Sequence, residues 1–422
     1  MCGIFMTQLT RQDCERLDQD DPLAAFRQEF DLPENTIYLN GNSLGAMPKK
    51  ALDQARQTVI NEWGKDLIKS WNVHDWFSMP QRLGDRLAPL IGAEAGEVVV
   101  TDSTGINLFK VLSAALTVQQ KACPDRKKIV MEGSNFPTDN YTAQGLIKLL
   151  GDQHEIVFAE GEDILQSIDD SVAVVCLTHV HYKSGRILDM EAITERTQAC
   201  GALSIWDLCH SAGAMPVDLN GCNADFAVGC TYKYLNGGPG SPAFIFTAKR
   251  HQGKALQPLT GWWGHAAPFA FERDYTPADN ISQMLSGTQP IVSLAMTEVG
   301  LDISARADLN LVRQKSQRLG DLFIRLLNER CAEYQFRVVS PADNELRGSQ
   351  VAIAHEQGYA IMQAMIARGV IGDFRAPDTL RVGFSALYVS YADVYDAVET
   401  LRDIMKNSIW QQPEYNRRHA VT

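Results

Sequence analysis

The segment of this sequence most suggestive of chemistry is Thr231-Tyr232-Lys233-Tyr234-Leu235-Asn236-Gly237-Gly238. The ordinary explanation of a lysine between two tyrosines is a surface hairpin with its amine in water, because lysine is rarely buried without a partner. The alternative is an amine that reaches a buried reaction centre, where it can attack a carbonyl group as a nucleophile. The glycines that follow would let the chain turn sharply beneath such a centre.

A carboxylate and an imidazole occur together in Asp207-Leu208-Cys209-His210, directly after the apolar run 202–206. Judged alone, Asp207 could cap a helix and His210 could be a hydrogen-bonded core histidine. Together with Lys233 they match the needs of pyridoxal phosphate. This cofactor requires a lysine for its imine linkage and a carboxylate that keeps its ring nitrogen protonated. A neighbouring histidine can stack on the ring or orient the carboxylate.

A phosphate group could be held where Thr101-Asp102-Ser103-Thr104-Gly105-Ile106 passes from a strand into a helix. Free N–H groups and the helix dipole favour an anion at such a point, although plain capping by Ser103 or Thr104 explains the residues equally well. Phe136-Pro137-Thr138-Asp139 follows the next strand and offers an aromatic face and a second carboxylate.

The elements that must position these residues are short apolar runs that alternate with helix-like segments. The runs are 98–101, 128–131, 155–158, 172–178, 202–207 and 243–246. Such alternation predicts a mostly parallel sheet covered by helices, which is the α/β class. Ligands of open α/β sheets bind at the carboxyl ends of the strands, where Thr178, Asp207 and the Ser103 turn lie.

The last third of the chain has a different pattern. A long helical region, broken at most once, covers about 290–332, and strands at 335–339, 350–354 and 380–384 flank helices at 358–368 and 391–405. This pattern predicts a smaller α+β domain. We therefore expect an N-terminal segment (1–60) that packs on the other domains, a large cofactor-binding domain (61–300) and a small domain (301–422).

Composition narrows the classes of partner. The chain has 422 residues and a formal net charge of -12, which disfavours nucleic acid or an anionic membrane as its main partner. It lacks an apolar run long enough to span a membrane. The nine cysteines form no CxxC pair and no zinc spacing, so we expect reduced thiols, no metal site and a cytoplasmic protein.

These motifs, together with Asn42-Ser43-Leu44-Gly45 and Gly261-Trp262-Trp263-Gly264-His265, resemble the kynureninase family from about residue 38 to residue 388. The lysine motif alone indicates only the broader fold type I pyridoxal enzymes of the aspartate-aminotransferase type. The GWWGH and YLNGNSLG segments narrow the resemblance to kynureninase. The resemblance implies a large α/β domain, a small domain, and a homodimer with active sites at the subunit interface.

The resemblance also implies roles for individual residues. Lys233 would carry the cofactor and move protons, Asp207 would pair with the ring nitrogen, and Phe136 would stack on the ring. The other implied cofactor contacts are Thr104, Gly105, Pro137, Thr138, Asp139, Thr178, His210 and Tyr232. Family members usually carry a hydroxyl residue where this chain has Gly105, so contact there must come from the backbone N–H.

Further implied roles concern the phosphate and the substrate. Trp262 and Thr288 would reach the phosphate from the partner subunit, and Arg381 would clamp the substrate α-carboxylate as a bidentate fork. Weaker candidates for substrate contact are Trp71, Ser43 and His74.

The implied reaction is hydrolysis of L-kynurenine, and more slowly of 3-hydroxykynurenine, to L-alanine and anthranilate or 3-hydroxyanthranilate. Lys233, Tyr232 and Asp207 would be catalytic. A cysteine desulfurase or a class V aminotransferase is the competing enzyme hypothesis. A desulfurase needs a reactive cysteine on a mobile loop near Arg381, whereas the only cysteine after Cys230 is Cys331, in a helical region. A binding module that only carries the cofactor is the non-enzymatic alternative.

Overall fold

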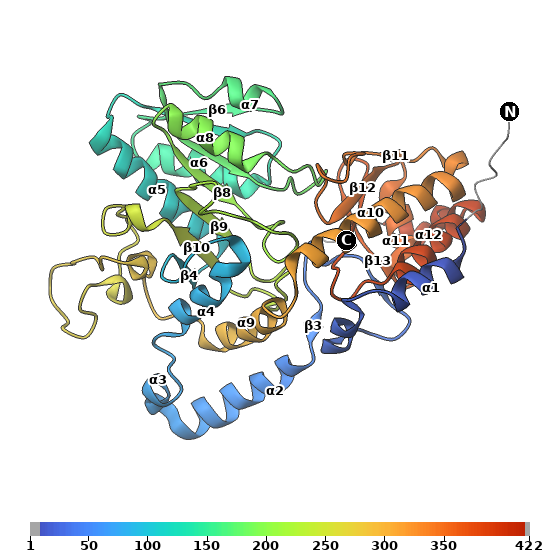
Figure 1. The fold of residues 1–422 in the computed structure, drawn as a ribbon, viewed down its shortest axis with the longest axis horizontal. Helices are drawn as coiled ribbons and strands as arrows, with labels where there is room; N and C mark the ends of the chain where they lie inside the picture. Colours follow the sequence, from blue (N-terminus) through green and yellow to red (C-terminus); the bar gives the residue numbers. More distant parts are fainter. Residues whose placement is uncertain (1–8, 418–422) are drawn as a thin grey trace. The chain divides into compact units, whose positions relative to one another are not determined.

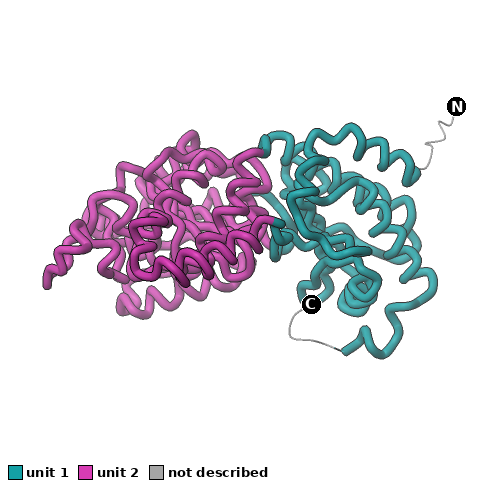
Figure 2. The backbone as a smooth tube through the Cα atoms, turned by 90° about the horizontal axis from the view of Figure 1, so that it is seen from below, with its two compact units in different colours: residues 1–49, 183–187, 307–422 teal, residues 50–182, 188–306 magenta. Residues whose placement is uncertain are grey.

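The chain folds into two compact units, which Figure 2 shows in different colours. The computed structural model describes residues 9–417. Unit 1 contains the residues up to 49, residues 183–187 and the residues from 307 on, and unit 2 contains 50–182 and 188–306. The predicted domain boundaries lie after residues 60 and 300, whereas the units divide after residues 49 and 306. The return of 183–187 to unit 1 carried no sequence signal.

Unit 2 is built on a seven-stranded sheet in the order β4-β10-β9-β8-β7-β5-β6. Figure 1 labels β4, β10, β9, β8 and β6 of this sheet. Strands β5 to β9 are parallel where they pair, and β10 is antiparallel to both β4 and β9. The predicted α/β class with a mostly parallel sheet is confirmed. The strands are β4 (Val98–Thr101), β5 (Lys128–Glu132), β6 (Glu155–Ala159), β7 (Val172–Thr178), β8 (Leu203–Asp207), β9 (Phe226–Gly229) and β10 (Ala243–Thr247).

The central strands are buried because helices cover the sheet. All seven residues of β7 are buried, which suits its continuous apolar run. Helix α5 (Thr104–Ala122) packs across β7, β8, β9 and β10, and α4 (Met79–Leu87) packs on β4. The other helices of this layer are α6 (Pro137–Leu149), α7 (Asp163–Gln166) and α8 (Met190–Ala199). Because β4 to β9 point the same way, their carboxyl ends share one edge, where the polar residues lie.

A helical segment precedes this sheet in the chain. It contains α2 (Lys50–Arg56), a π-helix (Gln57–Asp66) and α3 (Ser70–Val73), and α2 packs on α9 (Ile291–Ser304). Several large apolar side chains of this segment are exposed, namely Val59, Ile60, Trp63, Leu67, Ile68 and Val73. Across residues 9–417, no helix has the length and apolar character needed to cross a membrane.

Unit 1 is α+β, as predicted. Its four-stranded sheet has the order β11-β12-β15-β14, and a separate parallel pair joins β2 to β13. Its elements include α1 (Arg11–Gln19), β2 (Ile37–Tyr38), α10 (Leu309–Arg330), β11 (Arg337–Val338), β12 (Gln350–Ala354), α11 (Gly358–Ala367), β13 (Val370–Ile371), β14 (Asp373–Arg375), β15 (Thr379–Gly383) and α12 (Tyr391–Lys406).

The N-terminal segment is fixed to unit 1 by buried polar contacts. The Asp18 carboxylate accepts hydrogen bonds from the N–H groups of Tyr391 and Ala392 at 2.7 and 3.0 Å, at the start of α12. The buried Lys315 ammonium lies 2.7 Å from Asp21 Oδ2 and donates to the Ala386 carbonyl at 2.7 Å. Removing one partner of such a buried pair costs about 3–5 kcal/mol, so these contacts anchor α1 and the turn after it.

Candidate active site

A cavity of about 580 Å³ lies in unit 2 at the carboxyl ends of the strands. Its size is in the usual range for ligand sites. Ten of the predicted site residues line it: Thr104, Gly105, Phe136, Thr138, Asp139, Thr178, Asp207, His210, Tyr232 and Lys233. They come from five chain segments that only the sheet topology brings together.

Lys233 is half-buried in this cavity, and its Nζ lies 2.9 Å from Nε2 of His210. The Tyr232 ring centroid is 5.8 Å from Lys233 Nζ. The turn that follows needs glycine, because a Cβ on Gly237 would lie 2.9 Å from Ser241 Oγ and 3.0 Å from the Thr231 carbonyl oxygen. The close packing of this turn therefore holds the lysine backbone at the cavity floor.

Two buried carboxyl groups face each other in the cavity. Asp207 Oδ1 accepts a hydrogen bond from the Cys209 N–H at 2.7 Å, and Asp139 Oδ2 accepts one from Asn135 Nδ2 at 2.8 Å. Burial and the charge of Asp207 raise the pKa of Asp139 well above its usual range. A negative charge on Asp139 is therefore disfavoured while Asp207 is charged.

The first turn of α5 offers N–H groups to the cavity. Ser103 is the N-cap residue, and within the described residues its hydroxyl makes no capping hydrogen bond. A Cβ on Gly105 would lie 3.0 Å from Thr138 Cγ2, which is tight. The helix therefore presents its backbone at this position, and an anion can bind the unpaired N–H groups.

Aromatic and thiol groups complete the walls. Phe136 is 46% exposed, and its ring packs edge-on against Tyr182 with centroids 5.3 Å apart. Charge on the Cys230 sulfur, followed by burial, raises the pKa of Tyr232, so its phenol stays protonated. Pro137, the first residue of α6, is exposed and lies outside the residues that line the cavity.

Trp262 and Thr288 are not among the described residues that line the Lys233 cavity. Trp262 stacks on Trp263 with centroids 5.1 Å apart and, with Trp71, Phe77 and Phe269, lines a second cavity of about 560 Å³. Thr288 is exposed. His74 is half-buried, and its Nε2 lies 2.9 Å from Asp66 Oδ2.

The remaining predicted residues form a cluster in unit 1. Arg381 is 1% exposed, and its Nε and Nη2 donate to Asp373 at 2.9 and 2.5 Å. Ser43 Oγ donates to Asp373 Oδ2 at 2.6 Å and lies 2.8 Å from Arg381 Nη2. Asp373 therefore fixes the plane of the guanidinium group, which has five N–H donors in all.

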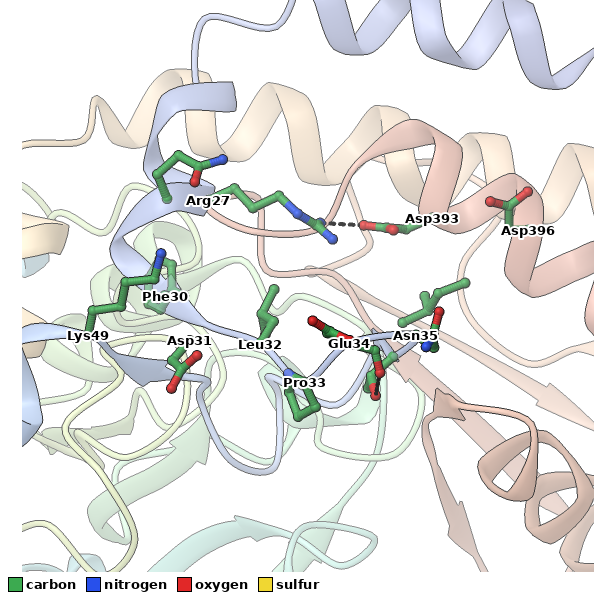
Figure 3. A pocket seen from close by; sticks show the side chains of 13 residues that line it. Arg27, Phe30, Asp31, Leu32, Pro33, Glu34, Asn35, Lys49, Asp393 and Asp396 are labelled. Carbon is green, nitrogen blue, oxygen red and sulfur yellow. Dashed lines mark hydrogen bonds and ion pairs between the residues drawn. The ribbon is translucent and has the colours of Figure 1, made fainter.

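Unit 1 also contains a cavity of about 610 Å³, drawn in Figure 3, whose chemistry is different. The Arg27 guanidinium forms an ion pair with Asp393 (dashed in Figure 3) and donates to the Tyr388 carbonyl. Asp396, another lining residue, forms an ion pair with Arg11. None of the predicted site residues is among the described lining residues of this cavity, so volume alone does not mark the reactive site.

Sequence reasoning gave no individual role to several polar residues of these clusters. Asp102, Asn135 and Tyr182 line the Lys233 cavity, Asn135 also donates to Asp139, and Asp373 accepts from Arg381. The position of Asp102 between a strand and a helix and the position of Tyr182 after β7 were usable signals. Asp373 carried none, because its partner Arg381 lies on a neighbouring strand.

Comparison with known proteins gives full-length relatives. The family described as the kynureninase C-terminal domain matches residues 312–401. A protein named kynureninase from Burkholderia pseudomallei (strain 1106a) is 53% identical over 414 residues, which cover 98% of this chain and 100% of the relative. A kynureninase from Pseudomonas fluorescens is 52% identical with the same coverage.

Solved structures share the fold at low identity. The apo cysteine desulfurase from Thermococcus onnurineus NA1 has a TM-score of 0.75 and 18% identity, covering 91% of this chain and 98% of that chain. A C-DES mutant with glycine covalently linked to the PLP cofactor has a TM-score of 0.76 and 15% identity, covering 89% and 99%. These likenesses concern the fold alone.

Proposed function

The chain belongs to the kynureninase family, and from this premise we propose that it is a cytoplasmic, pyridoxal-phosphate-dependent hydrolase of L-kynurenine. Its products would be anthranilate and L-alanine, and 3-hydroxykynurenine would react more slowly, in tryptophan catabolism. The observation that carries the proposal is the joint presence of Lys233, Asp207 and the first turn of α5 in one cavity.

The cavity residues fit the cofactor. Lys233 supplies the amine for its imine linkage, and Asp207 supplies a buried carboxylate for its ring nitrogen. The uncapped N–H groups of α5 and the Thr104 hydroxyl suit its phosphate. Phe136 offers a ring face, and Thr138, Asp139, Thr178 and His210 lie around it. When bound, the cofactor supplies an electron sink for the carbanion formed at the substrate Cα.

Individual residues have different roles in the proposed reaction. The Lys233 amine takes the proton from the substrate Cα, while His210 Nε2, 2.9 Å away, orients it. Water adds to the γ-carbonyl and gives up a proton, so negative charge develops on the carbonyl oxygen. The Cβ–Cγ bond then breaks, the γ-carbon leaves as the carboxylate of anthranilate, and Cβ keeps the electron pair and takes a proton to give alanine. The protonated Tyr232 phenol is the donor we assign to the charge on the carbonyl oxygen. Arg381, held by Asp373, would bind the α-carboxylate, with Ser43 beside it.

The function is tested by comparing kcat/KM for L-kynurenine and 3-hydroxykynurenine, with release of anthranilate or 3-hydroxyanthranilate measured by fluorescence. The ring pocket would include Trp71 or His74 on one side and the Gly287-Thr288 turn on the other. Animal family members tend to have Asn in place of Thr288 and favour the hydroxylated substrate. A single threonine hydroxyl, engaged by phosphate, leaves the extra substrate hydroxyl unpaired at a cost of roughly 1–3 kcal/mol.

We therefore expect roughly tenfold to hundredfold higher kcat/KM for L-kynurenine. Equal or reversed values would contradict the pocket assignment, and no anthranilate from L-kynurenine and no 3-hydroxyanthranilate from 3-hydroxykynurenine would contradict the function. Alanine formed from cysteine with release of sulfur would instead favour the desulfurase hypothesis.

We also propose a homodimer whose subunits complete each other's sites. Trp262 and Thr288 lie outside the Lys233 lining of their own unit, which suits a role in a neighbouring site. The side chains of Trp63 (60% exposed), Ile68 (77%) and Phe271 (81%) are large apolar groups exposed to solvent, which suits burial against a second subunit.

Mixing two inactive variants, Lys233→Ala and Thr288→Ala, should restore activity in heterodimers. Random pairing leaves one intact site in about half of the dimers, so we expect about a quarter of the wild-type activity per site. Each variant incubated alone is the control. A fully active monomer in sedimentation velocity, or no recovery after proven subunit exchange, would rule out shared sites.

A further inference from the structure

Lys110 is a buried cation behind the cavity, in the second turn of α5. Its side chain is fully buried, and its Nζ lies 2.6 Å from Asp102 Oδ2 and donates to the Met284 carbonyl at 2.7 Å. Burial lowers the pKa of Lys110, and the Asp102 charge opposes that shift. A fully buried lysine is rare and requires such partners.

Asp102 is the residue that connects Lys110 to the cavity. It lines the cavity and directly precedes Ser103, the N-cap residue of α5. Its φ of 44° lies in the left-handed region, which non-glycine residues adopt uncommonly and aspartate more often than most. Its carbonyl accepts a hydrogen bond from the Ala243 N–H at 2.8 Å, and its carboxylate is held by Lys110.

The charge balance of the cavity makes this ion pair important. The described lining contains three aspartates (Asp102, Asp139 and Asp207), of which Asp102 lies next to the α5 turn. A phosphate dianion bound at that turn would be repelled by an unpaired carboxylate on the adjacent residue. The Lys110 ammonium neutralises the Asp102 carboxylate, and Lys110 is not among the described residues that line the cavity.

The same contacts extend to the turn that contains Thr288. Lys110 bonds the Met284 carbonyl, and Thr101 Oγ1 lies 3.0 Å from both Asp102 Oδ2 and Gln289 Oε1. Gln289 Nε2 in turn donates to the Gly287 carbonyl at 2.9 Å. One buried ammonium therefore joins the α5 turn to residues 284–289.

We propose that Lys110 is a positioning residue for the cofactor phosphate: by pairing with Asp102 it neutralises and fixes the carboxylate beside the α5 turn. This inference rests on the proposed function, since it concerns the phosphate of pyridoxal phosphate. If Lys110 has this role, the ion pair should strengthen the binding of pyridoxal phosphate but not the binding of pyridoxal, which lacks the phosphate.

The test compares the Kd of the apoenzyme for pyridoxal phosphate and for pyridoxal, which lacks the phosphate, by absorbance titration. In Lys110→Met we expect pyridoxal phosphate to bind roughly tenfold to hundredfold more weakly, because one unscreened charge acts on the phosphate. Pyridoxal affinity should change by less than about threefold, since its contacts are uncharged at that end. Adding Asp102→Asn to Lys110→Met should restore most of the lost affinity.

The matched control is Lys315→Met, which removes a buried lysine with the same kinds of partner in unit 1. It should lower the melting temperature but leave the affinity ratio of the two ligands unchanged. If Lys110→Met does not fold, the double variant Lys110→Met/Asp102→Asn replaces it, because removing both charges avoids a buried unpaired ion. The double variant should bind pyridoxal phosphate within about threefold of the wild type, and a selective loss of pyridoxal phosphate affinity of more than about tenfold would overturn the role of the ion pair.

The outcomes separate the two proposals. A wild-type protein that binds no pyridoxal phosphate would contradict the proposed function itself. A wild type that binds it, with Lys110→Met unchanged in affinity, would overturn the role of Lys110. An equal loss of both ligands without rescue by Asp102→Asn would also overturn it, because that pattern indicates only a misfolded cavity.

Discussion

Lys233→Ala is expected to lower kcat for L-kynurenine by about a thousandfold or more, because it removes both the cofactor linkage and the group that moves the Cα proton. The purified wild type should be yellow, and the variant should lose the absorbance band of the imine. The half-buried position of Lys233, 2.9 Å from His210, is the structural basis for this expectation. Stopped assays of anthranilate and a visible spectrum measure both effects.

Lys249→Ala is the matched control for this prediction. Lys249 belongs to the same unit, but its side chain is 56% exposed and pairs with Glu94 on the surface. Its loss should change neither the spectrum nor kcat. A Lys233→Ala protein with an unchanged spectrum and substantial turnover would show that another amine carries the cofactor.

Asp207→Asn is expected to keep the fold and to lower kcat roughly a hundredfold to ten-thousandfold. An amide oxygen can still accept the Cys209 N–H bond that Asp207 Oδ1 accepts at 2.7 Å, so the local structure should persist. A neutral amide cannot hold a proton on the ring nitrogen, so the electron sink is lost. The measurement is kcat at saturating cofactor, with circular dichroism to establish the fold.

Asp225→Asn separates this effect from the general loss of a buried carboxylate. Asp225 is buried and bonded to Ser204, Arg250 and His251, away from the cavity lining. Its replacement should lower the melting temperature while leaving kcat per folded molecule unchanged. Near-normal turnover in Asp207→Asn with bound cofactor would assign the ring nitrogen to another acid.

Much of unit 2 could be predicted because most strands of its sheet are buried and form continuous apolar runs. Strand β7 is the clearest example, with all its residues buried. Strand β9 was missed because it has only four residues between turns, and its pairing with β10 is antiparallel. Its apolar residues become a strand through the sheet on either side, which a local pattern cannot show.

The candidate site was predictable where it depends on strand ends. Asp207 and Thr178 end neighbouring strands, and their Cα atoms are partners in the β7–β8 register. Lys110 could not be predicted, since its helical position looks like an ordinary surface lysine until the packing of Met284 over α5 is known. The left-handed backbone of Asp102 was equally invisible, because it depends on tertiary contacts.

The composition of unit 1 from three chain segments has a consequence for biosynthesis. Ile37 in β2 pairs with Val370 in β13, and α1 packs on α12, so the first segment finds its partners only near the end of translation. Residues 50–306, by contrast, contain the whole seven-stranded sheet and can fold while the ribosome still holds the rest. The residues before 50 must therefore wait, with Leu23, Phe30 and Leu39 uncovered, for the last helix to emerge. Chaperone contact during synthesis should concentrate on this early segment.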